Sequence, residues 1–123
     1  MPEINLLNSH PATKREYDKR ADEKTPEIIR LAKQFGKDFF DGDRKSGYGG
    51  YKYDGRWKAA VEQMRQHYNL PNDAKILDVG CGKGFMLHDF KEIMPGCSVA
   101  GIDVSEYAIE NSMPSIKKFL KVA

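Results

Sequence analysis

The stretch that decides the fold runs from Lys75 to Asp103 and reads KILDVGCGKGFMLHDFKEIMPGCSVAGID. A brief apolar run, residues 75–79, leads directly into a loop with three glycines, and a helical stretch, residues 85–94, follows. After Pro95-Gly96, a second apolar run ends in Asp103. This order predicts a β-α-β unit whose right-handed crossover makes the two strands parallel neighbours. The chain is therefore expected to be an α/β protein, with the glycine loop and Asp103 at one carboxyl edge of the sheet.

The glycine loop and Asp103 together indicate a ligand. A glycine-rich turn lets a ligand approach the backbone closely, and the amides at a helix start favour negative charge. Asp103 lies 23 positions after Gly80, close to the spacing at which an acid accepts hydrogen bonds from ribose hydroxyls. The pattern predicts an adenosine-type ligand.

The position of the third glycine narrows the choice of ligand. The dinucleotide fingerprint is GxGxxG, but Phe85 stands where its last glycine would fall, and Gly84 comes one residue earlier. The segment LDVGCGKG, residues 77–84, resembles motif I of the class I S-adenosylmethionine-dependent methyltransferases. GIDVS, residues 101–105, is similar to their second-strand motif. The resemblance implies an α/β Rossmann-like class I methyltransferase fold.

The same resemblance implies a cofactor, S-adenosylmethionine, and a reaction, methyl transfer to an acceptor that the residues do not identify. The glycine loop would pass under the methionine part of the cofactor, and Asp78 would lie near its ammonium group. Asp103 would hold the ribose hydroxyls, and Val104 would flank the adenine. The cofactor-binding residues expected on these grounds are Asp78, Gly80, Cys81, Gly82, Gly84, Asp103, Val104, Tyr48 and Tyr51. No catalytic base and no metal ligand is assigned.

Residues 37–56, KDFFDGDRKSGYGGYKYDGR, have neither strand nor helix periodicity and are expected to form a long loop. Residues 39–57 resemble a stretch that precedes motif I in a group of bacterial class I methyltransferases. By that resemblance the loop would close over the cofactor as a lid, with Tyr48, Tyr51 and Tyr53 facing the sulfonium. Two other interpretations stay open: a solvated flexible loop, and a patch that stacks the bases of single-stranded nucleic acid.

The rest of the chain divides into three parts. Residues 1–24 mix charges with few apolar side chains and are expected to be a flexible arm. Residues 25–70 form a helical extension with the lid loop, and residues 71–123 form the N-terminal part of the cofactor-binding domain. One helix is expected to begin after the N-cap Thr25 and to run through Phe35 to a stop at Gly36, and Ser105 is expected to cap another. The apolar face of a further helix is expected at Trp57, Ala60, Val61, Met64 and Tyr68.

The resemblance covers only part of a class I methyltransferase sheet, which has seven strands. Candidates are recognisable for the first two, and the sequence ends at KFLKVA, residues 118–123. The fold is therefore expected to be incomplete and the chain to be part of a longer protein. Strand 75–79 would then have one unpaired edge with Ile76, Leu77 and Val79 on it, which favours self-association.

Composition excludes several classes of protein. The 123 residues are 40% hydrophobic and 31% charged with a net charge of +2, which is typical of one ordinary domain without a general field for nucleic acid or membranes. No apolar stretch approaches the roughly 18 residues of a membrane span. Cys81 and Cys97 form no CxxC pair, and His10, His67 and His88 have no clustered ligand partners. A cytoplasmic location is expected.

Three alternatives to an active methyltransferase remain at this stage. One is a non-catalytic module or partner subunit that binds an adenosyl ligand, and another is a nucleotide-dependent oxidoreductase, which Phe85 disfavours. The third is an RNA-directed role through the tyrosine-rich loop. A small-molecule or sugar-type acceptor is preferred to nucleic acid.

Overall fold

The computed structural model describes residues 5–6, 25–42, 48 and 50–123. Apart from Asn5 and Leu6, the arm expected at residues 1–24 lies outside this part, as does most of the loop at residues 43–49. The elements are α2 (Pro26–Lys33), α3 (Lys37–Phe40), α4 (Lys58–His67), β1 (Lys75–Val79), α5 (Phe85–Ile93), β2 (Ser98–Asp103), α6 (Glu106–Glu110), the 3-10 turn η2 (Lys117–Phe119) and β3 (Leu120–Val122).

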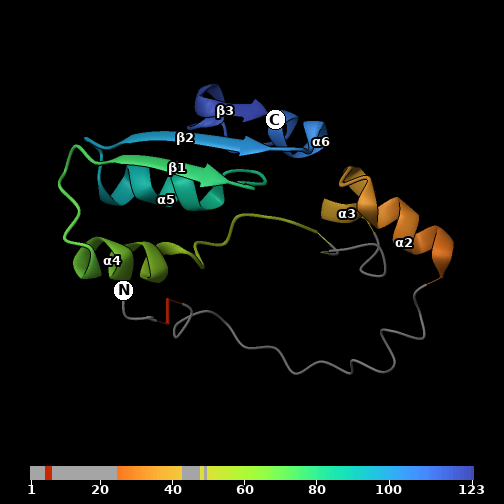
Figure 1. Cartoon of the computed structure of the whole chain (residues 1–123), viewed down its shortest axis with the longest axis horizontal. Helices are drawn as coiled ribbons and strands as arrows, with labels where there is room; N and C mark the ends of the chain where they lie inside the picture. Colours follow the sequence, from red (N-terminus) through yellow and green to blue (C-terminus); the bar gives the residue numbers. More distant parts are fainter. Residues whose placement is uncertain (1–4, 7–24, 43–47, 49) are drawn as a thin grey trace.

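The strands form one parallel sheet in the order β1-β2-β3 (Figure 1). Ile76 pairs with Val99 and Val79 with Ile102, so the predicted β-α-β unit is confirmed. β3 corrects the sequence analysis, which recognised candidates for two strands only. Leu120 pairs with Gly101, and the amide of Ala123 donates to the Asp103 carbonyl at 2.9 Å. A strand of three residues with a central lysine has no apolar run of its own, so pairing with β2 rather than local pattern defines it.

The core lies between one face of the sheet and the helices α5 and α4. Leu87 on α5, Val61 on α4 and Ile116 before η2 are fully buried, and Val99 of β2 meets them. In Figure 1, α5 lies along β1, and α4 lies on the far side of α5. The apolar residues of α5 therefore hold both the sheet and α4.

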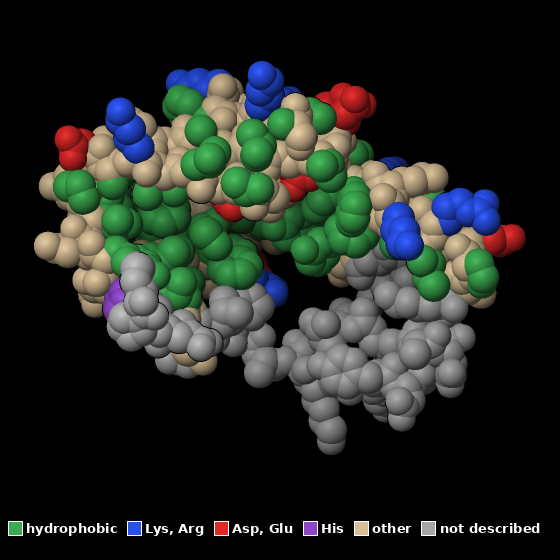
Figure 2. All heavy atoms as spheres, viewed as in Figure 1, with side chains coloured by type: hydrophobic (Ala, Val, Ile, Leu, Met, Phe, Trp, Pro, Cys, Tyr) green, Lys and Arg blue, Asp and Glu red, His purple; other side chains and the backbone are tan. Residues whose placement is uncertain are grey.

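The opposite face of the sheet is open to solvent in the described part of the chain. Leu77 is 63% exposed and Val79 is 71% exposed, as predicted for an apolar surface on this strand. Ile76 differs from the prediction because alternate residues of a strand face opposite sides, and it packs against the core. Hydrophobic side chains are spread over the strands and α5 in Figure 2.

The N-terminal helices differ from the prediction at their ends. Thr25 caps α2 as expected, since its Oγ1 accepts the Ile28 amide at 3.2 Å. The helix ends at Lys33 rather than at Phe35, whose φ of 51° is left-handed. Gly36 does not stop α2 but precedes a further helical turn, α3, where the sequence analysis expected loop. Residues 37–40 are too few for a helical periodicity to be recognised.

α4 confirms most of its predicted apolar face. Ala60 and Val61 are buried, and Met64 packs against the core. The prediction that Tyr68 belongs to that face is wrong. Tyr68 is 47% exposed, because the helix ends at His67 and the chain turns away. No helix within the described ranges is long and apolar enough to cross a membrane.

Candidate cofactor site

The glycine loop follows β1 directly and folds back over the end of β2. Gly80, Gly82 and Gly84 all have left-handed φ values, of 79°, 56° and 80°. The amides of Gly80 and Cys81 both donate to the Ile102 carbonyl, at 2.8 and 3.0 Å. Three left-handed positions within five residues explain why the sequence needs glycine at each of them.

The glycines differ in what surrounds them. A Cβ on Gly84 would lie 2.3 Å from Cδ1 of Ile116, so this glycine is needed for the packing of the loop against the chain before η2. A Cβ on Gly80 would meet nothing within 4 Å. The backbone at Gly80 is therefore the part of the loop that a ligand is free to approach. Gly84 instead allows the loop to pack against the core.

Asp103 joins the glycine loop to α6. Its Oδ2 accepts the Gly82 amide at 2.8 Å, and its Oδ1 accepts the Ser105 amide at 2.8 Å. A carboxylate has about four lone-pair sites, so both oxygens keep capacity for further donors such as ribose hydroxyls. The structure thus places the predicted acid beside the glycine loop, already oriented by two backbone amides.

Asp78 lies at the end of β1, half-buried below the loop. Burial, and then the charge of Asp103, raises the pKa of its carboxyl group. None of the residues in the described part of the chain donates a hydrogen bond to it. A half-buried carboxylate without a donor, near a second carboxylate, is stabilised by a cationic ligand group.

Cys81 lies within the loop but points into the core. It is 5% exposed, and its Sγ lies beside Gly101 and contacts the Gly82 carbonyl at 3.6 Å. Burial, with the charges of Asp78 and Asp103, raises the pKa of its thiol to about 12. Cys81 is therefore a protonated packing residue, and only its backbone is presented in the loop.

Tyr51 covers the middle of the glycine loop. A Cβ on Gly82 would lie 3.0 Å from Cε1 of Tyr51, whose ring also packs against Phe85 with centroids 4.5 Å apart. Tyr48, 52% exposed, stacks on the other side at 4.7 Å. Burial raises the pKa of the Tyr51 hydroxyl, which stays protonated. The structure thus places Tyr51 against the loop, with Tyr48 stacked on Tyr51.

Tyr53 and Val104 are placed differently. The Tyr53 hydroxyl donates to Oδ1 of the fully buried Asp89 on α5 at 2.5 Å, and its ring meets Phe85 and His88. Burial and this hydrogen bond raise the pKa of Tyr53 to about 12. Tyr53 is turned away from Tyr48 and Tyr51, so the expectation of three tyrosines facing one ligand is not met. Val104 is 67% exposed just beyond β2.

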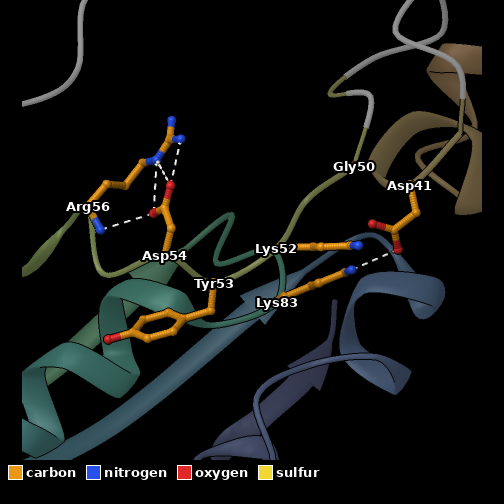
Figure 3. A pocket seen from close by; sticks show the side chains of 7 residues that line it. All are labelled: Asp41, Gly50, Lys52, Tyr53, Asp54, Arg56 and Lys83. Atoms are coloured by element: carbon orange, nitrogen blue, oxygen red, sulfur yellow. Dashed lines mark hydrogen bonds and ion pairs between the residues drawn. The ribbon is translucent and has the colours of Figure 1, made fainter.

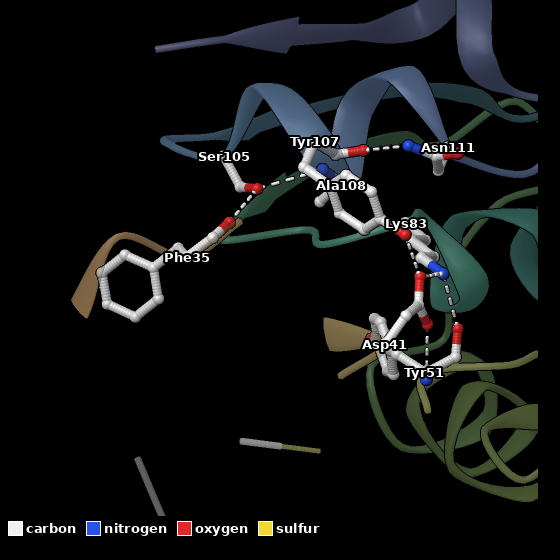
Figure 4. Close-up of polar contacts among 8 residues, drawn as sticks. All are labelled: Phe35, Asp41, Tyr51, Lys83, Ser105, Tyr107, Ala108 and Asn111. Carbon is white, nitrogen blue, oxygen red and sulfur yellow. Dashed lines mark hydrogen bonds and ion pairs between the residues drawn. The ribbon is translucent and has the colours of Figure 1, made fainter. Parts of the chain in front are cut away.

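A polar network that the sequence analysis did not identify fixes the segment before Tyr51 to the loop. Lys83, 8% exposed, donates from Nζ to Oδ2 of Asp41 at 2.7 Å and to the Tyr51 carbonyl at 3.0 Å (Figure 4). The Tyr107 hydroxyl donates to the same Oδ2 at 2.5 Å, and the Tyr51 amide donates to Oδ1 at 2.9 Å. Burial alone would raise the pKa of Asp41, but these donors lower it to about 2. Asp41 is therefore ionised at neutral pH and binds three segments together.

No local signal reveals this network. Lys83 occupies a position between two motif glycines that motif I leaves free, and Asp41 lies 42 residues upstream of it. Ser105 was predicted only as a helix cap, which it is, since its Oγ accepts the Ala108 amide at 3.0 Å. The same hydroxyl also donates to the Phe35 carbonyl, which links α6 to the end of α2.

A family model described as a methyltransferase domain matches residues 70–120, and no curated protein matches the chain. Among solved structures, the chain is similar to coclaurine N-methyltransferase bound to N-methylheliamine and SAH, at 15% identity and a TM-score of 0.45, covering 90% of this chain and 38% of that one. A SAM dependent methyltransferase from Aquifex aeolicus is 20% identical with a TM-score of 0.40, covering 89% of this chain and 47% of that one.

CalO1, a methyltransferase in calicheamicin biosynthesis in its SAH-bound form, is 20% identical with a TM-score of 0.39, and the match covers 86% of this chain and 34% of that one. The chain thus spans less than half the length of each of these structures. The match to the methyltransferase-domain model, residues 70–120, contains both the glycine loop and Asp103.

Proposed function

We propose that this chain binds S-adenosylmethionine at the glycine loop and takes part in methyl transfer. The observation that carries the proposal is the juxtaposition of the open backbone at Gly80 with two carboxylates, Asp78 and Asp103, at the carboxyl edge of a parallel sheet. When bound, the cofactor supplies an electrophilic methyl group on a sulfonium.

The residues present fit the parts of this cofactor. Asp103, oriented by the Gly82 and Ser105 amides, is suited to accept hydrogen bonds from ribose hydroxyls. Asp78 has no donor within the described residues and is suited to the ammonium of the methionine part. Val104, exposed beyond Asp103, is suited to contact the adenine.

Tyr48 and Tyr51 form the aromatic side of the proposed site. The Tyr51 ring covers Gly82 and the Tyr48 ring stacks on Tyr51, and aromatic faces attract a sulfonium cation. Because the Tyr51 hydroxyl stays protonated, it is not proposed as the base that activates the acceptor. The proposed role of these rings is to position the cofactor and to shield its sulfonium from water.

We propose a small-molecule acceptor rather than nucleic acid. A patch that stacks bases needs free ring faces, but Tyr51 is packed against Phe85 and Tyr48, and Tyr53 against Phe85 and His88. A cytoplasmic location is also part of the proposal. It agrees with the two cysteines, which are free thiols rather than a disulfide.

A ligand panel tests the proposed cofactor. Thermal unfolding of the chain is measured with S-adenosylhomocysteine, S-adenosylmethionine, NAD and ATP, each in excess. A rise in melting temperature with the two adenosyl amino acids alone supports the proposal, because stabilisation follows the affinity for the folded state. Stabilisation by NAD alone would instead favour an oxidoreductase.

A second measurement separates an enzyme from a module that only binds the ligand. Release of S-adenosylhomocysteine from S-adenosylmethionine is followed with a mixture of small acceptors that carry hydroxyl, amine and activated carbon groups. Turnover that disappears in Asp103→Ala supports methyl transfer. Cofactor binding without turnover on any acceptor supports the binding module.

A further inference from the structure

A cavity of about 580 Å³ lies beside the glycine loop, outside the cofactor site described above. It is formed where the extended segment after Gly50 passes Lys83 (Figure 3). The lining residues are Asp41, Gly50, Lys52, Tyr53, Asp54, Arg56 and Lys83. Nothing in the proposed cofactor chemistry uses this cavity.

The charges that line the cavity do not cancel. Arg56 is held by Asp54 through Nε at 3.0 and 3.1 Å and through a terminal nitrogen at 2.8 Å, and Lys83 is paired with Asp41 at 2.7 Å. Lys52 is exposed and makes no ion pair or hydrogen bond with any residue in the described ranges. Among its described residues, the lining therefore carries one cation in excess of its acids.

Beside the ammonium of Lys52, Lys83 supplies a hydrogen-bond donor that is held in place. Its ammonium has three N–H groups, of which one is used by Asp41 and one by the Tyr51 carbonyl. The side chain is only 10% exposed, so its position is set by packing and by those two acceptors. Figure 3 shows the side chains of Lys52 and Lys83 extending in the same direction, toward Asp41. One flexible and one fixed ammonium group thus face the same cavity.

We propose that this cavity binds an oxyanion, a carboxylate or a phosphate, carried by the methyl acceptor. Lys52 supplies the charge, and the remaining N–H of Lys83 supplies a positioned hydrogen bond. Lys83 lies between Gly82 and Gly84, so a group bound to it lies next to the loop assigned to the cofactor. This inference rests on the proposed function and extends it, because it assigns a chemical class to the acceptor.

A titration of the 123-residue chain tests the site. Inorganic phosphate and acetate are added separately at an ionic strength held constant with chloride, and amide signals are followed by ¹H–¹⁵N NMR. We expect saturable shifts at Lys52, Tyr53 and Lys83. Lys52→Gln is expected to weaken binding about tenfold, since a charge-assisted hydrogen bond is lost. Lys75→Gln, which removes an exposed lysine at the start of β1, is expected to change nothing.

The phosphate and acetate titrations together identify the chemical class of the oxyanion. Tighter binding of phosphate indicates a phosphorylated acceptor, and tighter binding of acetate indicates a carboxylic acid. Shifts that do not saturate, or that respond equally to Lys52→Gln and Lys75→Gln, would overturn the proposal. Tighter binding of a single-stranded RNA oligonucleotide, lost in Tyr48→Ala, would overturn it in favour of a nucleic-acid acceptor.

Titration of the same samples with S-adenosylhomocysteine separates this inference from the proposed function. Cofactor binding without a saturable anion site overturns the inference and leaves the proposed function standing. A saturable, Lys52-dependent anion site in a chain that does not bind the cofactor overturns the proposed function and the assignment of the anion to a methyl acceptor.

Discussion

The three glycines of the loop share one backbone conformation but have different surroundings. All three are left-handed, but Gly84 is also enclosed by the side chains of Ile116 and Leu120, and Gly82 lies against the Tyr51 ring. Gly80 faces open space. The same residue type therefore supports the core at one end of the loop and ligand access at the other.

This difference predicts unequal effects of the same substitution. Gly84→Ala combines left-handed strain with a clash against Ile116, and we expect it to lower the free energy of unfolding by about 3 kcal/mol. Gly80→Ala has the strain alone and is expected to cost about 1 kcal/mol. Urea denaturation of the two variants measures both values, and equal losses would show that the loop does not pack as described.

The surroundings of Cys81 predict the reactivity of its thiol. Because burial and the nearby carboxylates raise its pKa to about 12, the thiol is expected to resist iodoacetamide in the folded chain at mildly alkaline pH. Mass spectrometry after digestion is expected to find Cys81 alkylated only when urea is present. Rapid alkylation of Cys81 in the folded chain would instead indicate an accessible thiolate in the loop.

At the scale of elements, the Asp41 network connects the segment after α3 to the glycine loop. Lys83, Tyr107 and the Tyr51 amide all donate to one carboxylate. The side chains of Lys83 and Asp41 are 10% and 21% exposed, so the ion pair is largely removed from solvent. Such a pair orders the segment that carries Tyr51, although removing one partner costs more than the pair contributes.

A double-mutant cycle measures this coupling. Asp41→Asn and Lys83→Met are each expected to destabilise the chain by about 2 to 4 kcal/mol, with a coupling energy of about 1 to 3 kcal/mol in the double variant. Asp38→Asn, which removes an exposed acid from α3, provides the control and is expected to change little. Additive effects of the two substitutions would rule out a direct interaction in solution.

The same carboxylate predicts a pH dependence. Donors lower the pKa of Asp41 from 3.8 to about 2, so the folded state favours its ionised form. The resulting stabilisation is complete above pH 3.8 and is lost as the pH falls toward 2. The difference in unfolding free energy between the native sequence and Asp41→Asn is therefore expected to shrink over this interval. A difference that stays constant from neutral pH to pH 2 would argue against the lowered pKa.

Local signals in the sequence predict the local structure. The glycine loop and the apolar runs before and after it predict β1, α5 and β2, and the residue type of Ser105 predicts its capping role. Contacts that join distant segments leave no such signal. Asp41 and Lys83 are 42 residues apart, and β3 exists because Leu120 pairs with β2 rather than because of its own pattern. Pairings of this kind follow from the packed structure and leave no periodicity to detect.

In the whole molecule, as far as residues 5–6, 25–42, 48 and 50–123 show, one sheet face is covered and the other is not. α5 covers one face, whereas Leu77 and Val79 on β1 are 63% and 71% exposed, and β1 is an edge strand. An exposed apolar face next to an unpaired edge favours association. We therefore expect the average mass of the chain in solution to rise with concentration.

Light scattering over a range of concentrations measures this association. Val79→Lys is expected to lower the average mass, since a charge on the edge strand opposes pairing. Ser98→Lys adds the same charge at the exposed start of β2 without removing an apolar side chain, and it is expected to have little effect. A native chain that keeps the mass of one copy at every concentration would show that this face does not associate.

Calorimetric titration with S-adenosylhomocysteine shows whether the glycine loop with Asp103 is an adenosyl site. We predict one saturable site in the native chain, no measurable binding to Asp103→Ala, and unchanged binding to the control Asp73→Asn, an exposed acid before β1. Circular dichroism on each sample establishes that the chain is folded. A folded native chain that gives no saturable heat, or an Asp103→Ala variant that binds as tightly, would show that the loop and Asp103 do not form an adenosyl site.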